Sequence, residues 1–142
     1  MAENRTSETL RVVTVDDSPL IATRIGELLA EIPGIELRGK AGTIAEALSL
    51  IETEQPDVVL LDIHLSYDKP KTGIDLLHIV SRIHPRIKII MLTNLTDHSY
   101  RTMCKSSGAY MFLDKSNDFE KIPQILIEIR GYGEVLHCQE NY

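Results

Sequence analysis

The chain has 142 residues, of which 43% are hydrophobic and 25% are charged, and its formal net charge is −6. This size and composition fit one globular domain with a single core and exclude a disordered chain. The negative charge argues against a nucleic-acid-binding surface, which needs a basic footprint.

The apolar runs are also too short to span a membrane, and the first ten residues lack the apolar core of a signal peptide. Cys104 and Cys138 are not spaced as a CxxC pair, so reduced thiols and a cytoplasmic location are expected.

The first third of the chain alternates an apolar run, an amphipathic segment and a second run. Residues 11–15 are rich in β-branched side chains and end at two aspartates, which predicts a buried strand. Ser18 and Pro19 supply an N-cap and a first helical proline, and the apolar spacing that follows predicts a helix up to Pro33. Residues 35–41 alternate apolar and polar side chains, which predicts a strand nearer the sheet edge.

The middle of the chain repeats this order. A capping-box pattern over 43–46 predicts a second helix that ends before Pro56. Residues 58–61 are continuously apolar, as in a parallel strand covered on both faces. The polar segment 64–72 is interpreted as a loop, and residues 74–83 as a third helix.

The last third adds two more strand and helix pairs. Residues 87–92 and 109–113 are predicted strands. Between them, residues 97–108 have helical length but few large apolar groups, so a loosely held helix is expected. Apolar spacing over 122–129 predicts the final helix, although Pro123 leaves its first turn undefined.

Five strand and helix pairs in alternation, with no internal sequence repeat, predict an α/β fold with a doubly wound parallel sheet and helices on both faces. In such sheets, ligands bind at the carboxyl ends of the strands. Five side chains capable of phosphoryl chemistry lie at the carboxyl ends of four of the predicted strands: Asp16 and Asp17, Asp62, Thr93, and Lys115.

These residue types together favour phosphoryl transfer. Three carboxylates brought close together need raised pKa values or a bound cation, and oxygen ligands that keep several waters favour Mg²⁺. Lys115 would add a second cation and the Thr93 hydroxyl a hydrogen bond to phosphate, which leaves Asp62 as a nucleophile that forms an acyl phosphate.

Taken alone, each of these residues has an ordinary structural explanation. Asp16 and Asp17 before a helix are more often caps. Asp62 could belong to a turn, Thr93 to a loop and Lys115 to a solvated surface. Their joint placement at successive strand ends favours a site over these readings. The five histidines show no metal-ligand spacing and are interpreted as loop or surface residues.

At four motifs the chain closely resembles the receiver domain of bacterial two-component response regulators. The motifs are Val-Asp-Asp at 15–17, Leu-Leu-Asp-Ile-His-Leu at 60–65, Met-Leu-Thr at 91–93 and Gly-Ala-Tyr-Met-Phe-Leu-Asp-Lys at 108–115. The resemblance covers about 10–130 and implies a flavodoxin-like sheet of five strands in the order 2-1-3-4-5.

The resemblance also implies a role for each site residue. By it, Asp62 is the phosphoacceptor, and Thr93 and Lys115 bind the phosphoryl group. Phe112 is the switch aromatic that moves with Thr93. Mg²⁺ is implied to be held by the following groups: Asp16, Asp17, Asp62 and the backbone carbonyl of His64.

The implied partners are a sensor histidine kinase or a histidine phosphotransfer protein, and a downstream protein that binds the face made by the fourth helix, fifth strand and fifth helix. A second copy of the chain, in a phosphorylation-dependent homodimer, is a further implied partner. No direct contact with nucleic acid or membrane is expected, and no enzymatic activity beyond self-catalysed phosphorylation and dephosphorylation.

The expected organisation is a polar extension over 1–9, the receiver over 10–130, and an extension without an output domain over 131–142. This favours a stand-alone receiver. Three alternatives remain: a fragment of a longer DNA-binding response regulator, a degenerate receiver used only for interaction, and a Mg²⁺-dependent phosphohydrolase with an aspartyl nucleophile. Such phosphohydrolases usually carry a second aspartate where this chain has His64.

The chain departs from the family pattern at several places. The loop between Asp62 and Gly73 is three residues longer than usual, and Ser66 stands where proline is common. Ser116 also replaces a common proline, so a cis peptide before it is not assumed. Asn94 is bulkier than the usual residue there. We hypothesise that Asn94, with His64, modulates access to the phosphoryl site.

Overall fold

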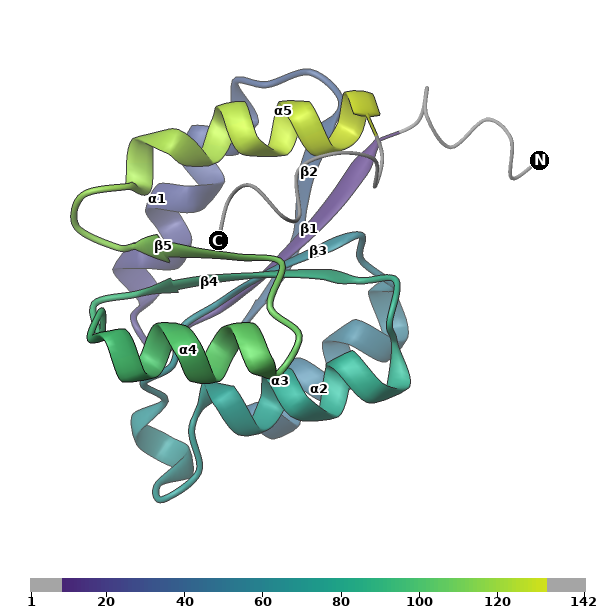
Figure 1. Ribbon diagram of the computed structural model, residues 1–142. Helices are drawn as coiled ribbons and strands as arrows, with labels where there is room; N and C mark the ends of the chain where they lie inside the picture. Colours follow the sequence, from purple (N-terminus) through teal and green to yellow (C-terminus); the bar gives the residue numbers. More distant parts are fainter. Residues whose placement is uncertain (1–8, 133–142) are drawn as a thin grey trace.

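The computed structural model describes residues 9–132 as one parallel sheet between two layers of helices (Figure 1). The strands lie in the order β2-β1-β3-β4-β5. They are β1 Leu10–Val15, β2 Ile35–Ala41, β3 Val58–Leu61, β4 Lys88–Thr93 and β5 Met111–Asp114. The helices are α1 Pro19–Ala30, α2 Ile44–Glu54, α3 Gly73–Ile83, α4 His98–Ser106 and α5 Ile122–Tyr132. The predicted fold class and strand order are confirmed.

The sheet is buried on both faces because helices cover each of them. In Figure 1, α1 and α5 lie above the sheet, and α2, α3 and α4 lie below it. Along β3, Val58 and Leu60 pack on the α1 and α5 side, while Val59 and Leu61 pack on the opposite side. This explains why the run has no polar alternation, since every side chain of a two-faced strand gains about 1.5–3 kcal/mol by burial.

Two predicted strands are shifted by one or two residues. The strand predicted over 87–92 is observed as Lys88–Thr93, and the one predicted over 109–113 as Met111–Asp114. The ladder continues through polar residues because Thr93 pairs with Asp114 across the two strands. Backbone hydrogen bonds, rather than side-chain polarity, therefore set where these strands end.

The capping box predicted at the start of α2 is only half formed. Thr43 accepts a hydrogen bond from the amide of Glu46, but the Glu46 carboxylate accepts from the amide of Gly42, at 2.8 Å, rather than from the cap residue. A complete box occurs instead at the start of α3, between Thr72 and Asp75. The segment predicted as a plain loop over 64–72 also contains a short 3₁₀ turn, Ser66–Asp68.

The helix α4 contributes one fully buried side chain, that of Cys104, whereas Met103 is 50% exposed. This agrees with the small number of large apolar groups in the sequence of this helix. Burial raises the pKa of the Cys104 thiol to about 11, so the thiol stays neutral in the core.

None of the helices within residues 9–132 combines the length and the apolar character needed to cross a membrane. The predictions made for 1–8 and 133–142, which include His137 and Cys138, lie outside the described residues.

Candidate functional site

The structure gathers the five predicted site residues at the carboxyl edge of the sheet. Asp16 and Asp17 follow β1, Asp62 follows β3, Thr93 ends β4, and Lys115 follows β5. β1 and β3 are neighbours although β2 lies between them in the chain, so their ends form the topological switch point of the sheet. The second strand, β2, contributes no site residue.

Lys115 links two of the carboxylates. Its Nζ lies 2.7 Å from Oδ2 of Asp16 and 2.8 Å from Oδ2 of Asp62, and the three side chains are 11%, 3% and 6% exposed. Burial by itself lowers the pKa of Lys115, but the hydrogen bonds to Asp16 and Asp62 outweigh burial and raise that pKa. The ammonium group is therefore charged at neutral pH.

Three acidic side chains lie close together near a single ammonium group, that of Lys115. The ligand oxygens of Asp16, Asp17 and Asp62 all lie within 4.8 Å of one another. Burial raises the pKa of Asp16 and the charge of Asp62 adds to this, against hydrogen bonds from Lys115 and the Ser18 amide. Three carboxylates beside one ammonium group form an oxygen-rich cluster whose remaining negative charge suits a divalent cation.

The Asp17 carboxylate is held by the β3–α3 loop. Its Oδ2 accepts hydrogen bonds from the Ser66 hydroxyl at 2.6 Å and from the Ser66 amide at 2.8 Å. Partial burial alone raises the pKa of Asp17, but the two bonds from Ser66 outweigh it and lower that pKa. Sequence reasoning noted Ser66 as unusual but did not assign it this contact, because the path of the longer loop could not be inferred.

The backbone at Asp62 is fixed by Gly73 at the start of α3. The Gly73 amide donates to the carbonyl oxygen of Ile63 at 2.7 Å. A Cβ atom at Gly73 would overlap the carbonyl oxygen of Asp62. The Asp62 carboxylate also accepts a hydrogen bond from the His64 amide at 3.3 Å. Gly73 was read from the sequence only as the end of a loop, and its close approach to Asp62 was missed.

Thr93 is fully buried and faces the loop that leads to α4. Its Oγ1 accepts a hydrogen bond from the amide of Leu95 at 3.2 Å, which leaves the hydroxyl proton free to be donated. The amide of Lys115 donates to the carbonyl oxygen of Thr93 at 2.9 Å. Thr93 is therefore hydrogen-bonded both to the backbone of Lys115 and to the β4–α4 loop.

Phe112 lies inside the core, below the sheet. It is 4% exposed, and the Arg101 guanidinium of α4 lies 4.6 Å from its ring centroid.

Asn94 is exposed, and its Oδ1 accepts a hydrogen bond from the Ser116 hydroxyl at 3.1 Å. Among the described residues, the one cis peptide is Lys69-Pro70, so the peptide before Ser116 is trans.

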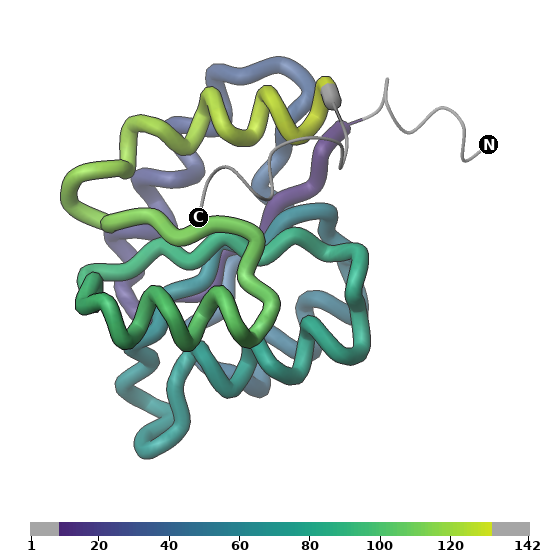
Figure 2. The backbone as a smooth tube through the Cα atoms, in the orientation of Figure 1, coloured from purple at the N-terminus to yellow at the C-terminus, as the bar shows by residue number. Residues whose placement is uncertain are grey.

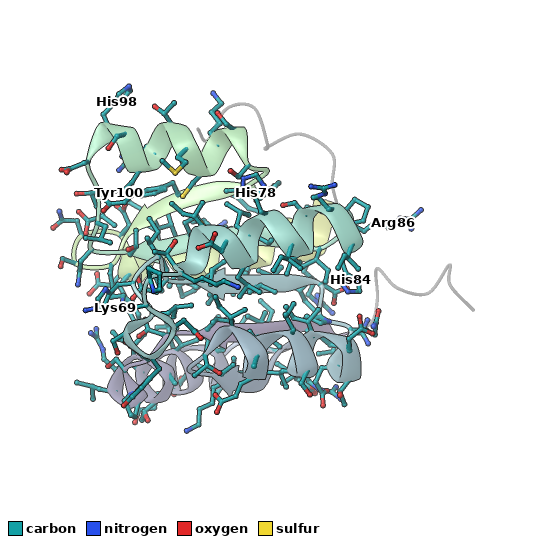
Figure 3. The ribbon with its side chains drawn as sticks, turned by 90° about the horizontal axis from the view of Figure 1, so that it is seen from below. Lys69, His78, His84, Arg86, His98 and Tyr100 are labelled. Atoms are coloured by element: carbon teal, nitrogen blue, oxygen red, sulfur yellow. The ribbon has the colours of Figure 1, made fainter. Side chains whose placement is uncertain are left out.

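The histidines do not gather at the site. His78, His84 and His98 lie apart from one another in Figure 3. His64, although next to Asp62 in the loop, is exposed, and His84 is half-buried and pairs with Glu52 at 3.2 Å. The interpretation of these four as loop or surface residues fits, with His84 more buried than expected.

The chain is similar to known proteins over most of its length. Residues 12–127 match the family model described as the response regulator receiver domain. The response regulator GacA of Pseudomonas viridiflava is 29% identical over 117 residues, which cover 82% of this chain and 53% of GacA. A protein-glutamate methylesterase/protein-glutamine glutaminase of Desulfotalea psychrophila is 37% identical over 116 residues, which cover 80% of this chain and 30% of that protein.

Solved structures show the same fold. The response regulator domain of Thermotoga maritima CheB has a TM-score of 0.76 at 25% identity, with 92% of this chain and 100% of that domain covered. The isolated REC domain of RcsB from Salmonella enterica has a TM-score of 0.80 at 19% identity, with 88% and 91% covered. The chain spans about half the length of GacA and about a third of the methylesterase.

Proposed function

The chain belongs to the response regulator receiver domain family, and on that basis we propose that Asp62 accepts a phosphoryl group from a sensor histidine kinase or a histidine phosphotransfer protein. The observation that carries this proposal is the contact of Lys115 with Asp16 and Asp62, at 2.7 and 2.8 Å, with the buried Thr93 at the end of β4, the strand between β3 and β5. These are the residue types that in-line transfer to a carboxylate requires.

The acidic cluster fits a hard divalent cation such as Mg²⁺. Its ligands would be the carboxylates of Asp16, Asp17 and Asp62 and the backbone carbonyl of His64, which are all oxygen donors. When bound, Mg²⁺ supplies positive charge that offsets the repulsion between the carboxylates and an incoming phosphoryl group.

In the proposed transfer, a carboxylate oxygen of Asp62 forms a bond to phosphorus. The bond from phosphorus to the imidazole nitrogen of the donor breaks, and its electron pair stays on that nitrogen. Lys115 neutralises charge on the phosphoryl oxygens and Thr93 donates its hydroxyl proton to one of them. Attack of water on phosphorus later returns the Asp62 carboxylate and releases phosphate, so the chain catalyses only its own modification.

The proposed output follows from the contacts of Thr93. If the hydroxyl turns toward a phosphoryl oxygen, the hydrogen bond from the Leu95 amide is strained, and the β4–α4 loop shifts with it. Phe112 signals by packing alone because it has no hydroxyl. The α4-β5-α5 face then binds a downstream protein or a second copy of the chain.

We further propose that Asn94 and His64 limit access to the phosphoryl site. Both are exposed. The His64 amide contacts the Asp62 carboxylate, and Asn94 follows Thr93 and is held in place by Ser116. The variant Asn94→Ala should gain phosphate from a small donor faster and lose it faster, as followed by intact-mass spectrometry. Unchanged rates for both processes would contradict this role.

The receiver is proposed to extend over 10–130 and to act by docking on other proteins, in the cytoplasm. Whether an effector domain belongs to the same polypeptide is decided by the length of the gene.

The site assignment is tested with acetyl phosphate and Mg²⁺. The unsubstituted protein should gain the mass of one phosphoryl group, and Asp62→Asn should gain none. Asp97→Asn is a matched control, because Asp97 is an exposed aspartate at the same edge whose side chain makes no capping hydrogen bond. Phosphorylation of Asp62→Asn at the rate of the control would contradict the assignment.

A further inference from the structure

The β3–α3 loop crosses the acidic cluster and is anchored on both sides of Ser66. Before Ser66, Leu65 is 1% exposed and belongs to the core on the α2 to α4 side. After it, Oδ2 of Asp68 accepts a hydrogen bond from the amide of Ile44, the first residue of α2, at 2.8 Å. The loop projects at the lower left of Figure 2, and these two anchors fix its base.

Both hydrogen-bond donors of Ser66 bind the same oxygen of Asp17. The hydroxyl and the amide both donate to Oδ2, across 49 positions in the chain. The Ser66 hydroxyl thus donates to Asp17, across the fold, rather than to the backbone of the 3₁₀ turn that begins at Ser66. Neither of these two bonds uses the second oxygen of Asp17, Oδ1.

We propose that Ser66 is a positioning residue of the divalent cation site, which fixes the orientation of the Asp17 carboxylate. A carboxylate that is free to rotate must lose that freedom when it binds a cation, whereas a carboxylate already held by two hydrogen bonds has lost it beforehand. Partners that orient a metal ligand in this way typically contribute 10–100-fold in metal affinity. A proline at this position would have neither donor.

The anchors make the role of Ser66 separable from that of the loop. Leu65 and Asp68 hold the loop through contacts that do not involve the Ser66 side chain. Ser66→Ala therefore removes one donor to Asp17 and keeps the loop in place. Ser66→Thr keeps both donors and serves as the conservative variant.

The test is the Mg²⁺ affinity of the whole chain, measured by isothermal titration calorimetry without any phosphodonor. Ser66→Ala should bind Mg²⁺ about 10-fold more weakly than the unsubstituted protein. Ser66→Thr should bind with nearly the original affinity, and Ser99→Ala, at an exposed serine of α4, should not differ. Circular dichroism and thermal unfolding of each variant check that the fold is kept.

The inference rests on the proposed cation site, and the outcomes separate the two. Equal Mg²⁺ affinity of Ser66→Ala and the unsubstituted protein would overturn the role of Ser66 and leave the proposed function standing. A failure of the unsubstituted protein to bind Mg²⁺ would overturn the cation site and the role of Ser66 together. Equal weakening in Ser66→Ala and Ser66→Thr would also overturn it, because the hydroxyl would then not be the cause.

Discussion

Replacement of Lys115 by alanine removes the cation that two buried carboxylates share. In the unsubstituted protein, Nζ lies 2.7 Å from Asp16 and 2.8 Å from Asp62, and the carboxylates are 3% and 6% exposed. Removing one partner from a buried ion pair typically costs about 3–5 kcal/mol, since the remaining charge is left desolvated. We expect Lys115→Ala to lower the free energy of unfolding by about 3 kcal/mol at pH 7 in the presence of a chelator.

Part of this loss should be recovered with Mg²⁺. A ligand that binds only the folded state adds about 2.7 kcal/mol when present at about 100 times its dissociation constant. Without Lys115, the carboxylates of Asp16 and Asp62 are unshared, so the variant keeps metal binding and should be stabilised by Mg²⁺ more than the unsubstituted protein. It should still fail to signal, because the cation that holds the phosphoryl group is gone.

The assay is urea unfolding followed by circular dichroism, with chelator and with Mg²⁺. Lys121→Ala is the matched control, because Lys121 pairs with Asp118 at 3.0 Å but is 68% exposed. An exposed pair of this kind contributes about 0–1 kcal/mol. A loss in Lys115→Ala no larger than in Lys121→Ala, or equal stabilisation of both by Mg²⁺, would refute the reasoning.

The difference in stability between the unsubstituted protein and Lys115→Ala depends on pH with a definite sign. The pKa of Lys115 is raised in the folded state, so its contribution is fully present below the ordinary lysine pKa of about 10.4 and is lost as the pH rises through the folded value. The gap in stability between the two proteins should therefore be constant near neutral pH and close only in strongly alkaline solution.

Two further substitutions test the backbone support of the site and its neighbouring turn. Gly73→Ala should lower the free energy of unfolding by about 1–3 kcal/mol and slow phosphorylation, because the new Cβ overlaps the Asp62 carbonyl. Gly131→Ala is the control: within the described part of the chain its new Cβ would meet nothing within 4 Å beyond its own helix backbone, so it should be neutral or stabilising by chemical denaturation. Equal effects of the two would contradict this. Asp118→Ala should cost about 1 kcal/mol at pH 7. The pKa of Asp118 is lowered, chiefly by a backbone amide, so its contribution is present above the ordinary value of 3.8 and lost as the pH falls through the folded value. A difference that grows on acidification would contradict that cause.

Most of the fold was predictable because each element has its own pattern in the sequence. The strands at 35–41 and 58–61 were predicted with their observed bounds, since side-chain alternation and full burial both leave clear signals. The ends of β4 and β5 were misplaced because Thr93 and Asp114 are polar yet remain in the hydrogen-bonded ladder.

The site was likewise predictable from the sequence only in part. The gathering of Asp62, Thr93 and Lys115 was predictable, because a parallel sheet brings the carboxyl ends of its strands to one edge. The contact of Ser66 with Asp17 and the approach of Gly73 to Asp62 were not. Both depend on the path of a loop, which has no periodic pattern from which it could be inferred.

The most direct measurement locates the modified residue chemically. The protein is phosphorylated with acetyl phosphate and Mg²⁺ and reduced with borohydride, which converts an aspartyl phosphate into homoserine. Its peptides are then identified by mass spectrometry. We expect homoserine at position 62 and unmodified aspartates at 16 and 17. Reduction at either of those two positions, with Asp62 intact, would contradict the assignment of Asp62 as the phosphoacceptor.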